Sequence, residues 1–250
     1  MIALPTLPLL ALLAVATGSA SVATGDGGAP PAPFAVVELY TSEGCSSCPP
    51  ADRLLSAIAA EAGHDHRNVM TLEFHVDYWN SPAWRDSFSD ASYSERQRGY
   101  ATVLRTELYT PQAVVNGRHA CVGSDSGTLH RDVADALTHT PRASIALQAR
   151  RGSGAFEIGY RVRGAPPGAL MCAALTESNF RTRVRGGENA GRELTHDGVV
   201  RAFLCAPLDP EGTGEVRLHD DGSSSHPRRA IVLIQDPNSL EIFAAASIAL

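Results

Sequence analysis

Apolar and polar positions in the first part of the chain follow the repeats of a strand, a helix and a second strand. Residues 35–40 form a short apolar run typical of a buried strand, and residues 69–76 alternate between apolar and polar side chains. After Cys48, apolar residues recur every three or four positions, and Pro49 and Pro50 fit only the first turn of a helix. These patterns predict a strand, a helix and a half-buried strand in that order.

The segment up to residue 140 adds a helix, a hairpin and a last helix. The predicted elements are a helix that begins at a Ser92–Glu95 capping box and carries Tyr100, strands over 112–115 and 118–122 joined by an Asn116–Gly117 turn, and a helix capped by Ser124 or Asp125. Because strands and helices alternate, residues 34–140 are predicted to form an α/β domain, a central mixed sheet flanked by helices.

Beyond residue 141 the helix signals stop and short strands follow one another. Strands are predicted at residues 144–149, 156–162, 170–175, 199–204, 215–218, 231–235 and 242–246. Gly, Pro, Asp and Ser turns separate them, which is typical of a small antiparallel sandwich or barrel. The sequence therefore predicts a smaller, mostly antiparallel, sandwich-like β domain over 141–250.

The amino-terminal apolar run indicates export. Residues 7–16 are apolar over a length that suits the core of a signal peptide and is too short to span a membrane. Cleavage after Ala20 or Ala23 fits the small-residue pattern, although no Arg or Lys precedes the run. We expect a signal peptide over 1–23, a linker over 24–33 and a periplasmic or secreted chain, with an uncleaved anchor or a misassigned start codon as the alternatives.

Composition and charge exclude several classes of function. The chain has 250 residues with 27 acidic and 21 basic side chains, a formal charge of −6, and no Lys. Such a chain has no basic stripe to follow phosphates, so we expect no nucleic-acid partner. It also has no phosphate-binding loop, dinucleotide fingerprint or zinc-protease motif, so we expect no cofactor. After the amino-terminal run no segment is apolar over the ~18 residues of a membrane span.

The motif Cys45-Ser-Ser-Cys48-Pro-Pro stands where a buried strand ends and a helix begins. A thiol beside the free amide hydrogens of a helix start has a lowered pKa, which would make Cys45 a nucleophile at neutral pH. Two intervening residues let Cys48 reach the first sulfur and resolve a mixed disulfide. Zinc sites use the same spacing, but no second such pair follows, and export favours a redox motif.

A second candidate segment is Thr110–Pro111, just before the predicted strand 112–115. A proline there can adopt a cis peptide bond that turns the chain toward the cysteine pair. Residues 34–139 resemble a thioredoxin fold, with 110–117 similar to its cis-proline strand and turn. The sequence departs from thioredoxin in having Ser46 and Ser47 between the cysteines, which leaves the redox potential open.

Five segments resemble a more specific family, the exported proteins called DUF1223. They are Glu38-Leu-Tyr-Thr-Ser-Glu-Gly-Cys-Ser-Ser-Cys-Pro-Pro-Ala-Asp52, His75-Val-Asp-Tyr-Trp79, Ser94-Glu-Arg-Gln-Arg98, Tyr109-Thr-Pro-Gln-Ala-Val-Val-Asn-Gly117 and Gly187-Glu-Asn-Ala-Gly191. The similarity runs from about residue 36 to the carboxyl terminus. It implies a thioredoxin-like domain, a carboxyl-terminal extension and a thiol-based site, and no substrate.

The leading functional hypothesis is an exported thiol:disulfide oxidoreductase. Cys45 would attack a disulfide of a protein or small thiol, Thr110–Pro111 would align the substrate, and Cys48 would resolve the intermediate. One alternative is a non-catalytic binding module in which the pair is a permanent disulfide. Another is a soft-metal site of Cys45, Cys48 and His75.

Several residues near the motif keep two interpretations. Glu38 is either a buried acid beneath the disulfide or the partner of an arginine. His75 and Asp77 either face the site or form a satisfied polar pair at a strand end. The aromatic residues Tyr78, Trp79 and Trp84 either line a substrate groove or pack in the core. The segment 187–191, flanked by Arg183, Arg185 and Arg192, is an anion-binding loop or a glycine-rich turn.

The remaining cysteines lie outside the motif. Cys172 and Cys205 fall on two predicted strands, and in an exported protein we expect them to form a structural disulfide. An odd total of five leaves Cys121 over, either buried beside the hairpin or reactive.

Overall fold

The computed structural model describes residues 31–220, 222 and 224–250, so the predicted signal peptide over 1–23 and most of the linker over 24–33 lie outside the described residues. The helices are α1 (Pro49–His64), α2 (Ala91–Leu104) and α3 (Ser126–Ala136), with a short 3-10 helix η1 (Asp77–Trp79). The strands are β1 (Ala35–Thr41), β2 (Val69–His75), β3 (Gln112–Val115), β4 (His119–Val122), β5 (Ser144–Gly152), β6 (Ala155–Arg163), β7 (Leu170–Glu177), β8 (Phe180–Arg183), β9 (Glu193–His196), β10 (Val199–Pro207), β11 (Thr213–His219), β12 (Arg228–Gln235) and β13 (Ile242–Ala249). None of the described helices is long and apolar enough to cross a membrane.

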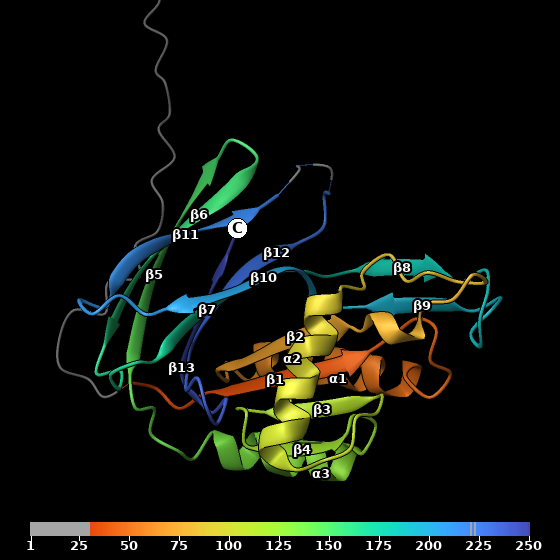
Figure 1. Ribbon diagram of the computed structural model, residues 1–250, viewed down its shortest axis with the longest axis horizontal. Helices are drawn as coiled ribbons and strands as arrows, with labels where there is room; N and C mark the ends of the chain where they lie inside the picture. The colour runs from red at the N-terminus through yellow and green to blue at the C-terminus, as the bar shows by residue number, and fades with distance from the viewer. Residues whose placement is uncertain (1–30, 221, 223) are drawn as a thin grey trace, which may run out of the picture.

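One large mixed sheet organises the described part of the chain (Figure 1). Its eight strands run in the order β13-β12-β7-β10-β2-β1-β3-β4. β1 pairs parallel to β2 and antiparallel to β3, which continues into β4 through the predicted Asn116–Gly117 turn. Both turn residues have positive φ, as this hairpin type requires. Asn116 Oδ1 also accepts a hydrogen bond from the Val36 amide at 2.6 Å and so joins the hairpin to β1.

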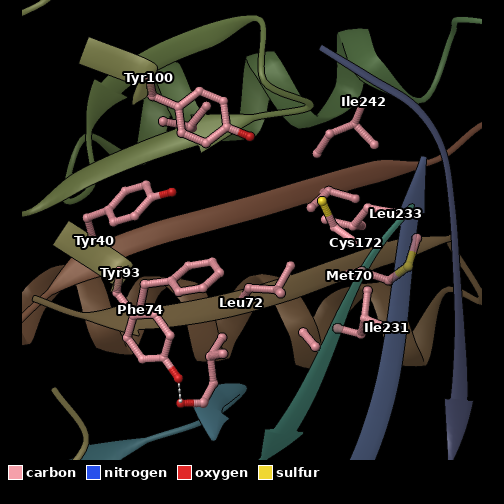
Figure 2. Close-up of a cluster of buried hydrophobic side chains, with 14 of the residues drawn as sticks. Tyr40, Met70, Leu72, Phe74, Tyr93, Tyr100, Cys172, Ile231, Leu233 and Ile242 are labelled. Carbon is pink, nitrogen blue, oxygen red and sulfur yellow. Dashed lines mark hydrogen bonds between the residues drawn. The ribbon is translucent and has the colours of Figure 1, made fainter. Parts of the chain in front are cut away.

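Helices cover both faces of this sheet because its strands alternate in side-chain direction. Ala35, Val37 and Leu39 of β1 pack against α1 and α3. Val36 and Tyr40 point the other way and pack with Tyr93 and Tyr100 of α2. Figure 2 shows that this second core continues past β2 to residues of β7, β12 and β13, so a single core joins the two halves of the sequence.

The strands beyond residue 141 are divided among three sheets. β7, β10, β12 and β13 extend the central sheet, with β10 joining β2 through the pair Val199 and Glu73. β5, β6 and β11 form a separate three-stranded sheet, which packs on the extension through a second apolar cluster, and β8 and β9 form a two-stranded sheet. The three-stranded sheet thus packs against strands that belong to the same large sheet as β1 and β2. The alternation of apolar and polar residues predicts which face of a strand is buried. It does not predict which other strand that strand pairs with.

One local prediction needs correction, and one hairpin was not predicted. Asp90, not Ser92, caps α2, because its side chain accepts a hydrogen bond from the Ser92 amide at 2.8 Å. The β8–β9 hairpin was not predicted, since each strand has only four residues and six of these eight residues are partly or fully exposed. For α3, Asp125 is the capping residue, one of the two alternatives the sequence offered.

Candidate active site around the Cys45–Cys48 disulfide

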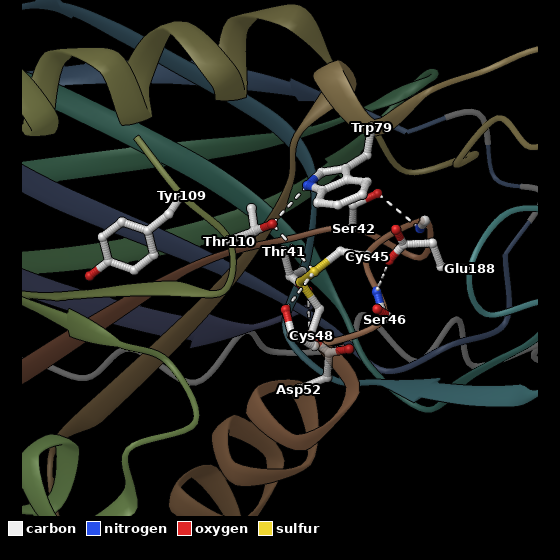
Figure 3. Close-up of a disulfide and its surroundings, with 12 residues drawn as sticks. Thr41, Ser42, Cys45, Ser46, Cys48, Asp52, Trp79, Tyr109, Thr110 and Glu188 are labelled. Atoms are coloured by element: carbon white, nitrogen blue, oxygen red, sulfur yellow. Dashed lines mark hydrogen bonds between the residues drawn. A yellow bond between two sulfur atoms is a disulfide. The ribbon is translucent and has the colours of Figure 1, made fainter. Parts of the chain in front are cut away.

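Cys45 and Cys48 form a disulfide, called here the site disulfide, at the amino-terminal end of α1 (Figure 3). β1 ends at Thr41 and α1 begins at Pro49, so a seven-residue loop carries both cysteines. Within it the Cys48 amide donates to the Cys45 carbonyl at 3.2 Å, a turn that brings the two side chains together. The pair therefore lies where the sequence predicted it, between a buried strand and a helix.

Thr110 contacts the site disulfide directly. Its peptide bond to Pro111 is cis, as the sequence predicted, and its hydroxyl donates to Cys45 Sγ at 3.3 Å. Trp79 Nε1 donates to the same hydroxyl at 2.7 Å and fixes its orientation (Figure 3). Thr110, Pro111 and both cysteines thus belong to one constellation, although more than 60 residues separate Thr110 from Cys45 in sequence.

A loop from the carboxyl-terminal half covers the cysteines. Asn189, fully buried, donates from its amide to the carbonyls of Glu43 at 2.9 Å and Cys45 at 2.8 Å. Glu188 accepts a hydrogen bond from the Ser46 amide at 3.0 Å. Both cysteines are completely buried, so the site disulfide is closed to solvent in this conformation.

This covering loop is the segment 187–191 singled out in the sequence. It connects β8 to β9, and the flanking Arg183 and Arg185 are exposed to solvent. Arg192 donates to Asn189 Oδ1 at 2.9 Å and holds the amide in position. Its role as a cover was not predicted, because nothing local in the sequence links residue 189 to residue 45.

A buried carboxyl group lies one helical turn after Cys48. Asp52 is almost fully buried on α1, and the Thr41 hydroxyl donates to its Oδ1 at 2.6 Å. Figure 3 shows its side chain beside Cys48. Burial, and secondarily the negative charge of Glu73, raises the pKa of Asp52 to about 7. Asp52 therefore exchanges its proton near neutral pH, next to the second cysteine.

Further buried titratable groups continue from Asp52 along β2. Glu73 and His75 point to the α1 side of the sheet, where His196 of β9 approaches them. Burial alone would raise the pKa of Glu73, but the two histidines lower it to about 2. Burial opposes the charged form of His75, yet Asp86 and Glu73 raise its pKa well above the ordinary value. This network makes a charged interior beneath the site.

Comparison with known proteins identifies the family. The family described as "Protein of unknown function (DUF1223)" matches residues 36–235. This chain belongs to the DUF1223 family. No curated protein matches it.

Two solved structures resemble the DUF1223 protein over most of its length. The X-ray crystal structure of protein AGR_C_4864 from Agrobacterium tumefaciens is 28% identical with a TM-score of 0.64, covering 89% of this chain and 96% of that one. HBP35 of Porphyromonas gingivalis is 15% identical with a TM-score of 0.66, covering 88% of this chain and 76% of that one. The second likeness concerns the fold alone.

Glu38 is the partner of an arginine and not the acid beneath the site disulfide. Arg96 donates to both of its carboxylate oxygens, at 2.6 and 2.9 Å, and the Tyr100 hydroxyl donates at 2.7 Å. The reason is that successive side chains of a strand point to opposite faces of the sheet. Glu38 shares the α2 face of β1 with Val36 and Tyr40, whereas α1 and the disulfide lie across the sheet.

The other ambiguous residues divide between the two interpretations. His75 belongs to the buried network, while Asp77 accepts from the Ser94 hydroxyl and forms a local polar pair. Trp79 contacts Thr110, and Trp84 donates to Glu43 at 3.2 Å, so both lie at the site. Tyr78 is 40% exposed and points its hydroxyl to Gln97.

Two further outcomes concern the cysteines of the DUF1223 protein. Cys172 and Cys205 form the predicted disulfide between directly opposed positions of β7 and β10. Cys121 is a free, buried thiol, and burial raises its pKa to about 11.

The soft-metal set of Cys45, Cys48 and His75 does not come together. Within the described residues His75 groups instead with Glu73 and His196.

Proposed function

We propose that this DUF1223 protein is an exported thiol:disulfide oxidoreductase with a thioredoxin-like fold. The observation that carries the proposal is the contact between the Cys45 sulfur, at the start of α1, and the hydroxyl of Thr110, the residue before a cis-proline. Two disulfides within one chain fit an oxidising compartment, as does the apolar run over residues 7–16.

The helix start supports a reactive Cys45. Pro49 and Pro50 leave no helical N–H at the first two positions of α1, while the Ala51 and Asp52 amides already bond to the Cys48 carbonyl. The helix dipole and the Thr110 hydroxyl are therefore the groups that favour a thiolate at Cys45. The neighbouring peptide of Thr110–Pro111 offers an edge along which an extended substrate would lie.

The reaction is a two-step exchange. In the reduced protein the Cys45 thiolate attacks one sulfur of a protein or small-molecule disulfide, forming a mixed disulfide and releasing the first substrate thiolate. Cys48 then attacks the Cys45 sulfur, forms the site disulfide and releases the second thiolate. The substrate gains two electrons that the two cysteines lose, and the reverse sequence donates a disulfide. A dithiol or disulfide partner restores the starting state.

Asp52 supplies the proton step in this scheme. The Cys48 thiol must lose its proton before it attacks, and a carboxyl group with a pKa of about 7, one turn along the same helix, accepts it at neutral pH. Thr41 holds this carboxyl in place through its hydrogen bond. The buried acid beneath the disulfide, one of the two interpretations that the sequence left open for Glu38, is Asp52 in this scheme.

A second candidate function rests on the complete burial of the two cysteines. If the covering loop never opens, the site disulfide is a permanent staple of a non-catalytic binding module. Access to the disulfide therefore separates the two functions, since exchange requires a thiolate to reach a sulfur atom in line with the S–S bond.

The deciding experiment is the reduction potential of the site disulfide. The mature protein is equilibrated in glutathione and dithiothreitol buffers, quenched with acid, alkylated and analysed by mass. A reversible potential between roughly −120 and −270 mV supports an oxidoreductase, whereas a value below about −300 mV, or no reduction short of unfolding, supports the staple.

Variants test the roles of the two cysteines. Cys45→Ser is expected to abolish disulfide reduction, and Cys48→Ser to accumulate a mixed disulfide with the substrate. Cys121→Ser is the matched control, because it removes a buried thiol outside the site. A Cys45→Ser protein with full activity would refute the assignment.

A further inference from the structure

The second disulfide of the chain, between Cys172 and Cys205, lies apart from the site disulfide. Cys172 packs in the apolar cluster on the α2 side of the large sheet (Figure 2), whereas Cys45 and Cys48 lie on the α1 side. Neither Cys172 nor Cys205 takes part in the exchange proposed above. Any reaction of this second disulfide is therefore independent of the site disulfide.

The two disulfides differ in their exposure to solvent. Cys45 and Cys48 are both completely buried, and so is Cys172, but Cys205 is exposed. An exposed disulfide is in general more easily reduced than a buried one, because a thiolate must reach one of its sulfur atoms. Of the four disulfide-bonded cysteines, Cys205 is thus the one that a thiol in solution can reach without any opening of the structure.

The free edge of β10 gives a thiol a line of approach to Cys205. Exchange needs attack in line with the S–S bond, and this bond runs across from β10 to β7, where Cys172 directly opposes Cys205. The line of attack on the Cys205 sulfur therefore leads away from β7, over the other edge of β10. Among the strands that the structure describes, only β2 pairs with that edge, at Val199, so the edge has no paired strand over residues 201–207.

Cys172, the leaving sulfur, has a hydrogen-bond acceptor ready on its buried side. Its Sγ lies 3.6 Å from Gln235 Oε1. In the disulfide neither atom carries a hydrogen, but a reduced Cys172 thiol can donate to that oxygen. Arg96 Nη1 donates to the same oxygen at 3.1 Å, and Gln235 Nε2 donates to the Tyr100 hydroxyl at 3.0 Å, which fixes the orientation of the amide. The buried thiol formed by reduction therefore has a partner.

We propose that the Cys172–Cys205 disulfide is a second thiol-exchange site, which accepts a low-molecular-weight thiol of the glutathione type at Cys205. The thiolate attacks Cys205 Sγ, a new S–S bond forms, and the bond to Cys172 breaks. Cys172 leaves as a thiolate and takes up the proton that the attacking thiol released to solvent. A second thiolate then attacks the sulfur of the bound small thiol, which releases Cys205 as a thiolate together with a small-molecule disulfide. The two small thiols lose the two electrons that the protein disulfide gains.

The test uses the full mature chain with both disulfides formed. The protein is incubated with reduced glutathione in native buffer, quenched with acid at intervals, alkylated and digested, and each reduced cysteine is located by peptide mass. Because Cys205 is exposed and the site disulfide is covered, we expect the Cys172–Cys205 bond to open roughly ten-fold faster or more than the Cys45–Cys48 bond. Tryptophan fluorescence, followed in parallel, checks that the protein stays folded.

Two matched variants test which sulfur accepts the small thiol. Cys172→Ala leaves Cys205 as an exposed thiol, and Cys205→Ala leaves Cys172 as a buried one. With oxidised glutathione, the first variant is expected to gain one glutathione on Cys205, and the second to gain none on Cys172 while it is folded. Cys121→Ser removes the remaining free thiol and is expected to exchange as the wild type does.

Three results would each overturn the proposal. They are opening of the Cys45–Cys48 bond before the Cys172–Cys205 bond, no opening of the Cys172–Cys205 bond short of unfolding, and equal glutathione labelling of the two alanine variants. The wild-type peptide map decides the outcome even if a variant fails to fold. It also follows the two disulfides separately, so a site disulfide that resists reduction counts against the proposed function and not against this second exchange site.

Discussion

The buried carboxyl of Asp52 makes the stability of the folded protein depend on pH. Its pKa is raised from an ordinary value of 3.8 to about 7, so between these values the folded state binds a proton that the unfolded chain releases. The free energy of unfolding therefore falls as pH rises. This stabilising contribution is complete below pH 3.8 and is lost as pH rises to and through 7.

Replacing Asp52 with Asn removes this dependence. The amide oxygen of Asn keeps an acceptor for the Thr41 hydroxyl, and the side chain is neutral at every pH. With 1.36 kcal/mol per pKa unit, the two-state titration gives wild type an extra loss of about 2.6 kcal/mol between pH 5 and pH 8. Asp52→Asn is thus expected to gain stability relative to wild type by that amount over the same interval.

The measurement is urea unfolding of both proteins at intervals from pH 5 to pH 8, followed by tryptophan fluorescence. Asp135→Asn is the control, because that carboxyl lies 58% exposed near the end of α3. Parallel free-energy curves for wild type and Asp52→Asn would refute the reasoning, since Asp52 would then have the same proton affinity in both states.

Three further predictions concern the disulfide of the extension, the buried ion pair and the covering loop. Replacing Cys172 and Cys205 together by Ala is expected to lower the free energy of unfolding by about 4 kcal/mol, because their bridge closes a 33-residue span; an unchanged urea midpoint would contradict this. Glu38→Gln is expected to cost about 3–5 kcal/mol by leaving the Arg96 charge uncompensated, and adding Arg96→Met should restore part of it in the same assay. Asn189→Ala removes two hydrogen bonds that close the loop and is expected to speed glutathione reduction of the site disulfide roughly ten-fold or more. Equal rates by quenched alkylation would show that the loop does not limit access.

Local patterns in the sequence determined most of the elements and the position of the thiol pair. The period-2 alternation of β2, the two prolines at the start of α1 and the Asn116–Gly117 turn each act over a few residues, so their structural consequence is readable without the fold. The Cys45–Cys48 spacing likewise limits what that pair can do, because only a short loop separates the two sulfurs.

Tertiary structure decided which acid, which loop and which histidine meet at the site. Glu38 and Asp52 are both buried acids close to the cysteines in sequence. Only the fold shows that Asp52, on α1, lies on the same side of the sheet as the disulfide, whereas Glu38 points to the opposite side. Asn189 reaches Cys45 across 144 residues, and His196 reaches Glu73 across 123. Both contacts follow from β10 pairing with β2, which carries the covering loop and β9 over the α1 side of the sheet. The order of strands from distant segments depends on which pairing buries the most apolar surface. That order cannot be predicted from the local pattern of either segment alone.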